Sequence, residues 1–200
     1  EDFLLPGLID IHFHGCLGKD FCDGTREAVS TLAKYEAEHG ITGICPATLT
    51  LPVEELEKVL GLARTYRDEG LKIGEARLLG INMEGPFISP VKKGAQNPNY
   101  ILKWDDRIAN RFLEVSGGLV KYMGIAPEEN PAFKEFIPKM QGKVRISLAH
   151  TNADFQTAVE AYRAGASHAV HLFNAMTGLD HRNPGVVGAT MEQKEVFAEL

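Results

Sequence analysis

The chain has 200 residues, of which 44% are apolar and 24% are charged, and its net charge is −6. This composition fits one soluble globular domain or part of a larger protein. The sequence holds no long basic run and no apolar run near the roughly 20 residues that span a bilayer, so neither nucleic acid nor a membrane is expected as a partner. Its three cysteines form no C-x-x-C pair, which favours a reducing, cytoplasmic location over a disulfide framework.

The first predicted strand covers residues 6–15 and carries two histidines near its end. Residues i and i+2 of a strand point to the same face, so His12 and His14 are expected side by side. Asp10 shares that face one step earlier, and we expect it to orient its neighbours. Gly15 is expected to end the strand. Two imidazoles delivered in one direction predict the beginning of a metal site.

Helices and strands alternate through the rest of the sequence. Capping residues and apolar stripes predict helices over residues 25–39, 52–70, 105–115, 130–140 and 154–164. Short apolar runs predict strands over residues 41–45, 76–83, 119–125, 144–149 and 168–173, and a further strand followed by a helix over residues 186–200. The stretch from residue 87 to residue 104 shows little periodicity and is expected to be a functional loop.

The repeated strand–helix order predicts an α/β fold with a parallel sheet and helices outside. A doubly wound open sheet and a (β/α)8 barrel both satisfy this order. The first strand is followed by no phosphate-binding glycine pattern, and polar residues gather at the carboxyl ends of several strands, which favours the barrel. About six or seven strands cannot close an eight-stranded barrel. We therefore expect residues 1–200 to form a single, incomplete barrel domain that is a piece of a longer protein.

Five potential metal ligands follow these strands, namely His12, His14, Glu84, His150 and His171. In a parallel barrel they would share one rim, where imidazole and carboxylate groups suit Zn²⁺ first, with Fe²⁺ as the alternative. The remaining histidines lack this placement, since His39 and His181 are expected on the surface and His168 opens a strand at the opposite end.

Several sequence blocks resemble the amidohydrolase superfamily and, within it, the family of N-acetylglucosamine-6-phosphate deacetylases. The opening strand matches the superfamily pattern. The more specific blocks are Met83–Phe87, Lys92–Pro98, Ala149–Ala153 and His171–Met176, and they occur in the family's order.

The resemblance implies a (β/α)8 barrel of the metal-dependent hydrolase type that removes the acetyl group of N-acetylglucosamine 6-phosphate. It implies one divalent ion on Glu84, His150 and His171, and a second ion where His12 and His14 are both kept. It also implies that the chain lacks an N-terminal β segment and a C-terminal part. The general-base aspartate is expected beyond residue 200, so no catalytic residue is assigned within the chain.

Substrate contacts are implied by the same motif matches. They fall on Ala95, Gln96, Asn174, Ala175 and Arg182. Arg182 would suit the 6-phosphate, since a guanidinium pairs with phosphate in a fork. In the family such contacts can come from a neighbouring subunit, so a homodimer is expected. The alternatives are another amidohydrolase, acting on an N-acyl amino acid or a cyclic amide, and an inactive fragment.

Overall fold

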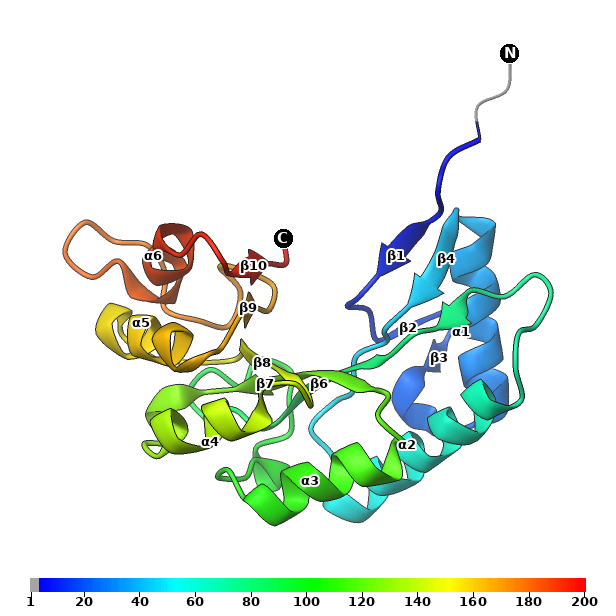
Figure 1. Cartoon of the computed structure of the whole chain (residues 1–200), viewed down its shortest axis with the longest axis horizontal. Helices are drawn as coiled ribbons and strands as arrows, with labels where there is room; N and C mark the ends of the chain where they lie inside the picture. The colour runs from blue at the N-terminus through cyan, green and yellow to red at the C-terminus, as the bar shows by residue number, and fades with distance from the viewer. Residues whose placement is uncertain (1–3) are drawn as a thin grey trace. The chain divides into compact units, whose positions relative to one another are not determined.

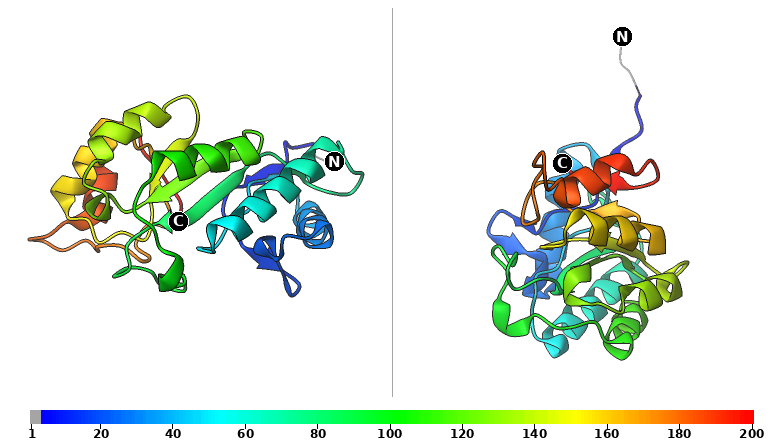
Figure 2. Two further views of the ribbon diagram at one scale, coloured as in Figure 1. Left: turned by 90° about the horizontal axis from the view of Figure 1, so that it is seen from below. Right: turned by 90° about the vertical axis from the view of Figure 1, so that its left-hand side faces the viewer.

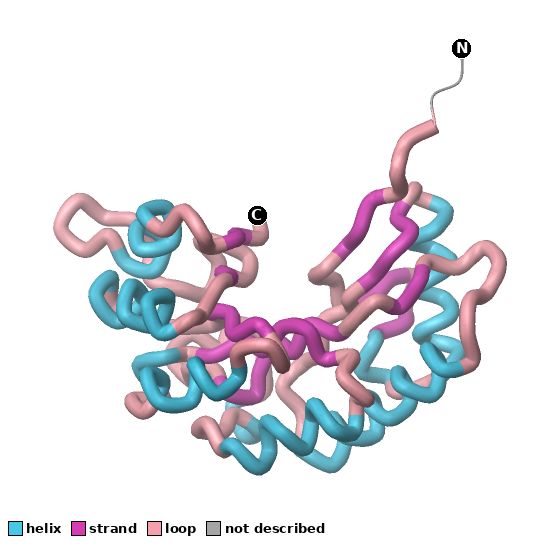
Figure 3. The backbone as a smooth tube through the Cα atoms, in the orientation of Figure 1, coloured by secondary structure: helices cyan, strands magenta, loops and turns pink. Residues whose placement is uncertain are grey.

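The computed structural model describes residues 4–200. Its contacts divide the chain into two compact units. Unit 1 comprises Glu1–Thr48, Val53–Asn82 and Arg111–Val120, and unit 2 comprises Leu49–Pro52, Met83–Asn110 and Lys121–Leu200. In each unit, strands alternate along the chain with helices (Figure 3). The expected single domain over residues 1–200 stays a prediction.

Unit 1 contains a three-stranded parallel sheet in the order β1-β4-β5 (Figure 1). Its main elements are β1 (Leu8–Asp10), α1 (Arg26–Glu38), β4 (Ile41–Ile44), α2 (Val53–Asp68) and β5 (Arg77–Leu78). Helix α1 begins as predicted, because the Thr25 side chain accepts the Ala28 N–H at 3.1 Å. The apolar stripe of α1 is buried, which anchors the helix in the unit.

The opening strand is shorter than predicted. It stops at Asp10, whose carboxylate accepts the His12 N–H at 2.9 Å and so turns the backbone out of the regular ladder. His12 and His14 therefore lie in the segment after the strand. Gly15 does not simply end it, because β2 (Gly15–Cys16) pairs antiparallel with β3 (Lys19–Asp20) before the short 3-10 helix η1 (Phe21–Asp23).

Unit 2 holds most of a five-stranded sheet in the order β10-β9-β8-β7-β6, in which β7 to β10 pair parallel. The strands are β6 (Ile81–Phe87), β7 (Val120–Ile125), β8 (Arg145–Leu148), β9 (His168–Ala169) and β10 (Phe197–Ala198). The helices are α4 (Phe133–Met140), α5 (Phe155–Ala164) and α6 (Gly185–Glu192), with 3-10 turns η2 (Pro98–Tyr100) and η3 (Pro127–Glu129), and the residues of α3 (Asp106–Val115) are divided between the two units. Helices α5 and α6 pack side by side (Figure 2).

Three boundaries in this region differ from the prediction. The strand expected over residues 76–83 is two strands in different sheets, so Glu84 lies inside β6 rather than after it. The strand expected over residues 168–173 is only two residues long, because His171 has a φ of 32° and leaves the extended conformation. The last segment forms a helix before its strand, since the valines of α6 are buried as helix residues beside α5.

Within residues 4–200, none of the helices is both long and apolar enough to cross a membrane.

Candidate metal centre

Glu84, His150 and His171 converge in unit 2. Glu84 projects from β6, and each histidine is the second residue after its strand, β8 or β9. Glu84 Oε1 lies 2.8 Å from His171 Nε2 and 3.1 Å from His150 Nε2. The two Nε2 atoms are 3.2 Å apart. Tetrahedral ligands placed about 2.0–2.1 Å from Zn²⁺ would be separated by about 3.3 Å, so these three donors fit a single ion.

Backbone carbonyls orient both imidazoles. His150 Nδ1 donates to the carbonyl of Lys92 at 2.9 Å, and His171 Nδ1 donates to the carbonyl of Asn174 at 3.0 Å. A proton fixed on Nδ1 leaves the Nε2 lone pair for a cation. Two imidazole lone pairs directed at one carboxylate oxygen repel one another unless a proton or a metal ion lies between them. The donor set is therefore that of a cation site.

The histidine loops carry backbone strain. His150 has a φ of 43°, His171 of 32°, Phe173 of 77° and Ala175 of 51°. A left-handed residue with a Cβ costs roughly 1–2 kcal/mol, and such residues cluster at functional sites. The Thr151 N–H donates to the carbonyl of Ala175 at 3.0 Å and joins the two loops. This hydrogen bond between the two loops thus helps to maintain their strained backbone conformations.

A glycine lets the Lys-Lys-Gly loop approach the centre. Gly94 has a φ of 56°, and a Cβ placed there would lie 3.2 Å from Cε1 of the His150 ring. A side chain at this position would push against the ligand ring. The close approach to the His150 ring thus explains why this loop has a glycine at position 94.

Gln96 is buried and faces the glutamate ligand. Its Nε2 donates to Glu84 Oε2 at 2.5 Å, and its Oε1 accepts the Thr50 N–H at 2.6 Å. Only this orientation of the amide gives both neighbours a suitable partner. Gln96 therefore orients the Glu84 carboxylate, a role that the sequence analysis missed. The expected contact of Gln96 with a sugar stays a prediction.

The centre is open on one side. Glu84 is 3% exposed, whereas the side chain of His171 is 24% exposed. Ala95 and Asn174 are exposed, and Ala175 is partly exposed beside them. All three positions are thus accessible to solvent, and their expected contacts with a substrate stay predictions.

Arg182 lies on an exposed loop and borders a cavity of about 470 Å³ with Asn152 and Thr177. Its backbone N–H donates to Asp180 at 2.9 Å. Among the described residues, no hydrogen bond or ion pair involves its guanidinium. The structure therefore does not bring Arg182 against the three donors, and its phosphate role stays a prediction.

The other histidines fall into three groups. His12 and His14 belong to unit 1, where their ring centroids are 5.4 Å apart in an edge-to-face arrangement. A second ion bound by this pair stays a prediction. His39 and His181 are exposed, which confirms the expectation of surface residues. His168 opens β9 as expected, but it is buried and its Nε2 lies 2.8 Å from Glu199 Oε1. No local sequence pattern connects residues 168 and 199.

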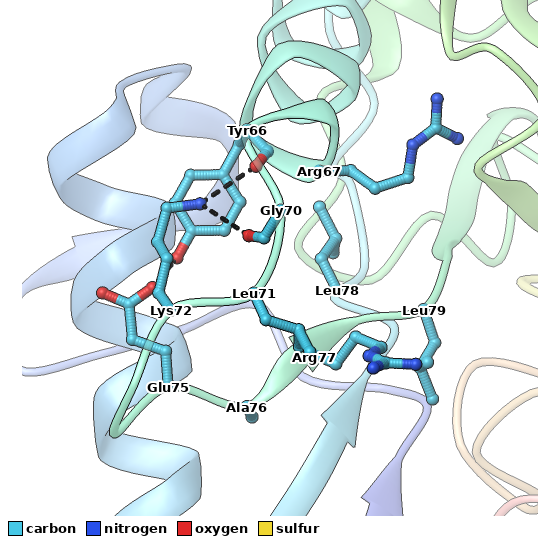
Figure 4. Close-up of a pocket in the computed structure, with 10 residues that line it drawn as sticks. All are labelled: Tyr66, Arg67, Gly70, Leu71, Lys72, Glu75, Ala76, Arg77, Leu78 and Leu79. Atoms are coloured by element: carbon cyan, nitrogen blue, oxygen red, sulfur yellow. Dashed lines mark hydrogen bonds between the residues drawn. The ribbon is translucent and has the colours of Figure 1, made fainter.

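A cavity of about 330 Å³ in unit 1 differs in character (Figure 4). Its Lys72 ammonium donates to the carbonyl oxygens of Tyr66 and Gly70, and lies 3.6 Å from the centroid of the Tyr66 ring. The Glu75 carboxylate accepts hydrogen bonds from Ser30 and Tyr66. Because these polar groups satisfy one another, we assign no chemistry to this cavity.

A parallel α/β fold that brings a carboxylate from within one strand together with two imidazoles that follow two other strands defines the class of metal-dependent barrel hydrolases. The model of the amidohydrolase family matches residues 3–196. The chain belongs to the amidohydrolase family. The predicted fold class, an incomplete (β/α)8 barrel, is thereby confirmed.

Individual relatives carry related names. The N-acetylglucosamine-6-phosphate deacetylase of Bacillus subtilis (strain 168) is 36% identical over 202 residues, covering 100% of this chain and 51% of the relative. The N-acetylgalactosamine-6-phosphate deacetylase of Escherichia coli O157:H7 is 33% identical, covering 100% of this chain and 52% of the relative. The solved structure of N-acetyl-D-glucosamine-6-phosphate deacetylase from Mycobacterium smegmatis aligns with a TM-score of 0.89 and 30% identity, over 98% of this chain and 50% of that one. The chain spans about half the length of the relatives it matches.

Proposed function

We propose that the protein to which this chain belongs hydrolyses the acetamide of N-acetylglucosamine 6-phosphate to glucosamine 6-phosphate and acetate. The observation that carries this proposal is the convergence of Glu84, His150 and His171 in a chain that is 36% identical to a deacetylase of that substrate. A structure of the Mycobacterium smegmatis relative is described as a complex with N-acetyl-D-glucosamine-6-phosphate, which supports the same substrate.

The three side chains would hold one divalent ion, with Zn²⁺ as the first expectation and Fe²⁺ as the alternative. When bound, the ion supplies the Lewis acidity that activates water and polarises an amide carbonyl. The backbone carbonyl groups of Lys92 and Asn174 accept the Nδ1 protons of His150 and His171, so that each ring presents its Nε2 atom to the ion. Glu84 is buried, so bulk water does not compete with an ion for its carboxylate. A second ion on His12 and His14 remains part of the proposal.

The proton transfer requires a carboxylate that takes a proton from water and gives it to the leaving amine. We assign this role to no residue between 4 and 200 and expect it from an aspartate elsewhere in the intact protein. On the substrate side, Ala95, Asn174 and Ala175 would contact the sugar and Arg182 the 6-phosphate. A cytoplasmic homodimer completes the proposal.

The second candidate is the 4-epimer, N-acetylgalactosamine 6-phosphate, which the Escherichia coli O157:H7 relative favours. The metal centre does not separate the two epimers, because none of its three donors is assigned a contact with the 4-hydroxyl of the sugar. Other amide substrates, such as N-acyl amino acids and cyclic amides, are the remaining alternatives.

The test is an assay of amide hydrolysis by the intact protein, which follows acetate release from both phosphorylated sugars and from an N-acetyl amino acid, and ring opening of a cyclic amide. We expect acetate from N-acetylglucosamine 6-phosphate at the highest kcat/KM, and loss of the activity after treatment with a chelator. Hydrolysis of the galactosamine epimer or of a non-sugar amide alone would replace the proposed substrate. The 200-residue chain assayed alone shows whether it suffices, and we expect it to be inactive.

A further inference from the structure

We propose that Glu199, held by His168, is a positioning residue that fixes the backbone of the metal ligand His171. In this way it tunes the affinity and the coordination geometry of a divalent ion at the centre. The inference rests on the proposed metal centre and adds two residues to which neither the sequence motifs nor the family comparison assigns a role.

Glu199 forms hydrogen bonds with the backbone of His171 and of residues on either side of it. Its Oε2 accepts the His171 N–H at 3.2 Å, and its own carbonyl accepts the Leu172 N–H at 2.7 Å. Its N–H donates to the carbonyl of Ala169 at 3.0 Å, continuing the parallel pairing of β9 with β10, which lie side by side in Figure 1. One residue thus contacts the chain before, at and after the histidine.

The position being held is a strained one. His171 has a φ of 32°, in the region that side chains with a Cβ disfavour. Such a conformation persists when surrounding contacts determine it. If the Glu199 bonds were absent, the backbone at His171 could relax toward an ordinary φ, and the ring would rotate away from Glu84. Because Nε2 of His171 must stay within about 2.0–2.1 Å of an ion, small rotations weaken binding.

His168 fixes the other end of the carboxylate. Its Nε2 donates to Glu199 Oε1 at 2.8 Å, and its ring packs 5.0 Å from that of Tyr122. His168 is 3% exposed, so water does not compete freely for this bond. The carboxylate is therefore anchored at one oxygen by His168 and supports His171 with the other. This arrangement resembles the outer contacts that commonly orient metal-ligating histidines.

The experiment compares variants of the intact protein. Metal-free protein is titrated with Zn²⁺ in competition with a chromophoric chelator, and with Co²⁺ to record the visible absorption spectrum of the bound ion. The variants are Glu199→Ala, Glu199→Gln and His168→Phe. The matched control is Glu195→Ala, which removes an exposed glutamate four residues earlier. Thermal unfolding of each metal-free protein shows whether it folds.

We expect Glu199→Ala to weaken Zn²⁺ binding by about 10- to 100-fold and to change the Co²⁺ spectrum, as loss of outer contacts to metal ligands usually does. Glu199→Gln keeps an oxygen for the His171 N–H, and its affinity should stay within a few-fold of the wild type. The Zn²⁺ affinity of His168→Phe should fall between those of these two variants, and the affinity of Glu195→Ala should match that of the wild type.

Wild-type affinity and an unchanged Co²⁺ spectrum in Glu199→Ala would overturn the proposal. If Glu199→Ala does not fold, His168→Phe decides in its place, and unchanged affinity and spectrum there have the same consequence. The wild-type protein reports separately on the metal centre, since failure of that protein to bind either ion contradicts the proposed function rather than the role of Glu199.

Discussion

At the scale of single residues, the centre depends on the direction of each donor atom as much as on its identity. Both imidazoles are turned by a carbonyl group, and the glutamate is held by a buried amide. Each ligand therefore has its own outer partner: Lys92 and Gln96 come from the loop after β6, and Asn174 comes from the turn after β9. Such partners reduce the conformational entropy that binding an ion would otherwise remove.

Replacing Glu84 with glutamine should abolish tight metal binding, because an amide oxygen carries no charge to balance the ion and the amide group would also face the Gln96 donor. We expect Zn²⁺ content to fall from near one equivalent to a small fraction, measured by elemental analysis after gel filtration. Glu129→Gln, which alters a carboxylate bonded to Ser89 and Lys103, is the control. Full occupancy in Glu84→Gln would contradict the ligand assignment.

Removing the guanidinium of Arg182 should raise KM for the phosphorylated sugar by roughly 10-fold or more, since a charge-assisted pair contributes about 1.5–3 kcal/mol. Activity on an unphosphorylated N-acetyl sugar should change little. The comparison uses kcat and KM on both substrates, with Arg163→Ala as the control. Equal effects of Arg182→Ala on the two substrates would argue against a phosphate contact.

At the scale of elements, the best predictions are those in which local chemistry and burial agree. Thr25 and Asp154 begin α1 and α5 as helix-capping residues, and the predicted helix over residues 154–164 is nearly that of the structure. The strands were less predictable. Asp10 ends β1 through a side-chain hydrogen bond, and His171 ends β9 through a left-handed backbone. Apolar patterning alone indicates neither event.

The ligand set was predictable because Glu84, His150 and His171 sit at the ends of short apolar runs in a repeated strand–helix order. Their outer partners were not. The hydrogen bond from Gln96 to Glu84 depends on the path of the loop after β6, and the one from His171 to Glu199 depends on the pairing of β9 with β10. Hydrogen bonds of this kind have no period in the sequence, so a pattern search cannot find them.

Helix α5 should show a pH-dependent cap. The backbone N–H of Thr157 donates to Asp154 at 2.7 Å and lowers the pKa of this carboxyl. A lowered pKa in the folded state stabilises the fold above the unfolded pKa of about 3.9, and this contribution is lost as the pH falls through the folded value. Asp154→Ala should thus reduce the free energy of unfolding by about 1 kcal/mol at pH 7.

The measurement is urea unfolding of wild-type and variant protein at several pH values. The difference between wild type and Asp154→Ala should shrink as the pH falls from roughly 5 toward 2. Asp154→Asn keeps an acceptor without the charge, and its difference from Asp154→Ala should not depend on pH. A wild-type advantage over Asp154→Ala that is constant across this range would show that the charge is irrelevant.

At the scale of the whole molecule, unit 1 exposes more apolar surface than a stable monomer usually does. Leu8 and Ile9 on strand β1 are 68% and 59% exposed, and Leu71 and Ile73 beside β5 are also exposed. Because β1 is an edge strand of its sheet, its unpaired backbone groups accompany this apolar surface.

The 200-residue chain on its own should therefore associate and bind a hydrophobic dye. Ile9→Lys should reduce both effects, because a charge on an edge strand discourages pairing with another chain. Leu17→Lys, in the exposed turn between β2 and β3, is the control for added charge. Chromatography with light scattering measures the association, and a monodisperse wild-type monomer without dye binding would contradict the expectation.

The hydrogen bond between Thr151 and Ala175 has a consequence for how the centre could be altered. It joins the two turns that carry the imidazoles. A change in the length of either turn would therefore displace the other. Insertions after Met176 should consequently be tolerated. Insertions between residues 149 and 175 that break this hydrogen bond should disrupt the metal centre. Redesign of this scaffold for a different metal is best begun at Glu84, because strand β6 takes no part in that hydrogen bond.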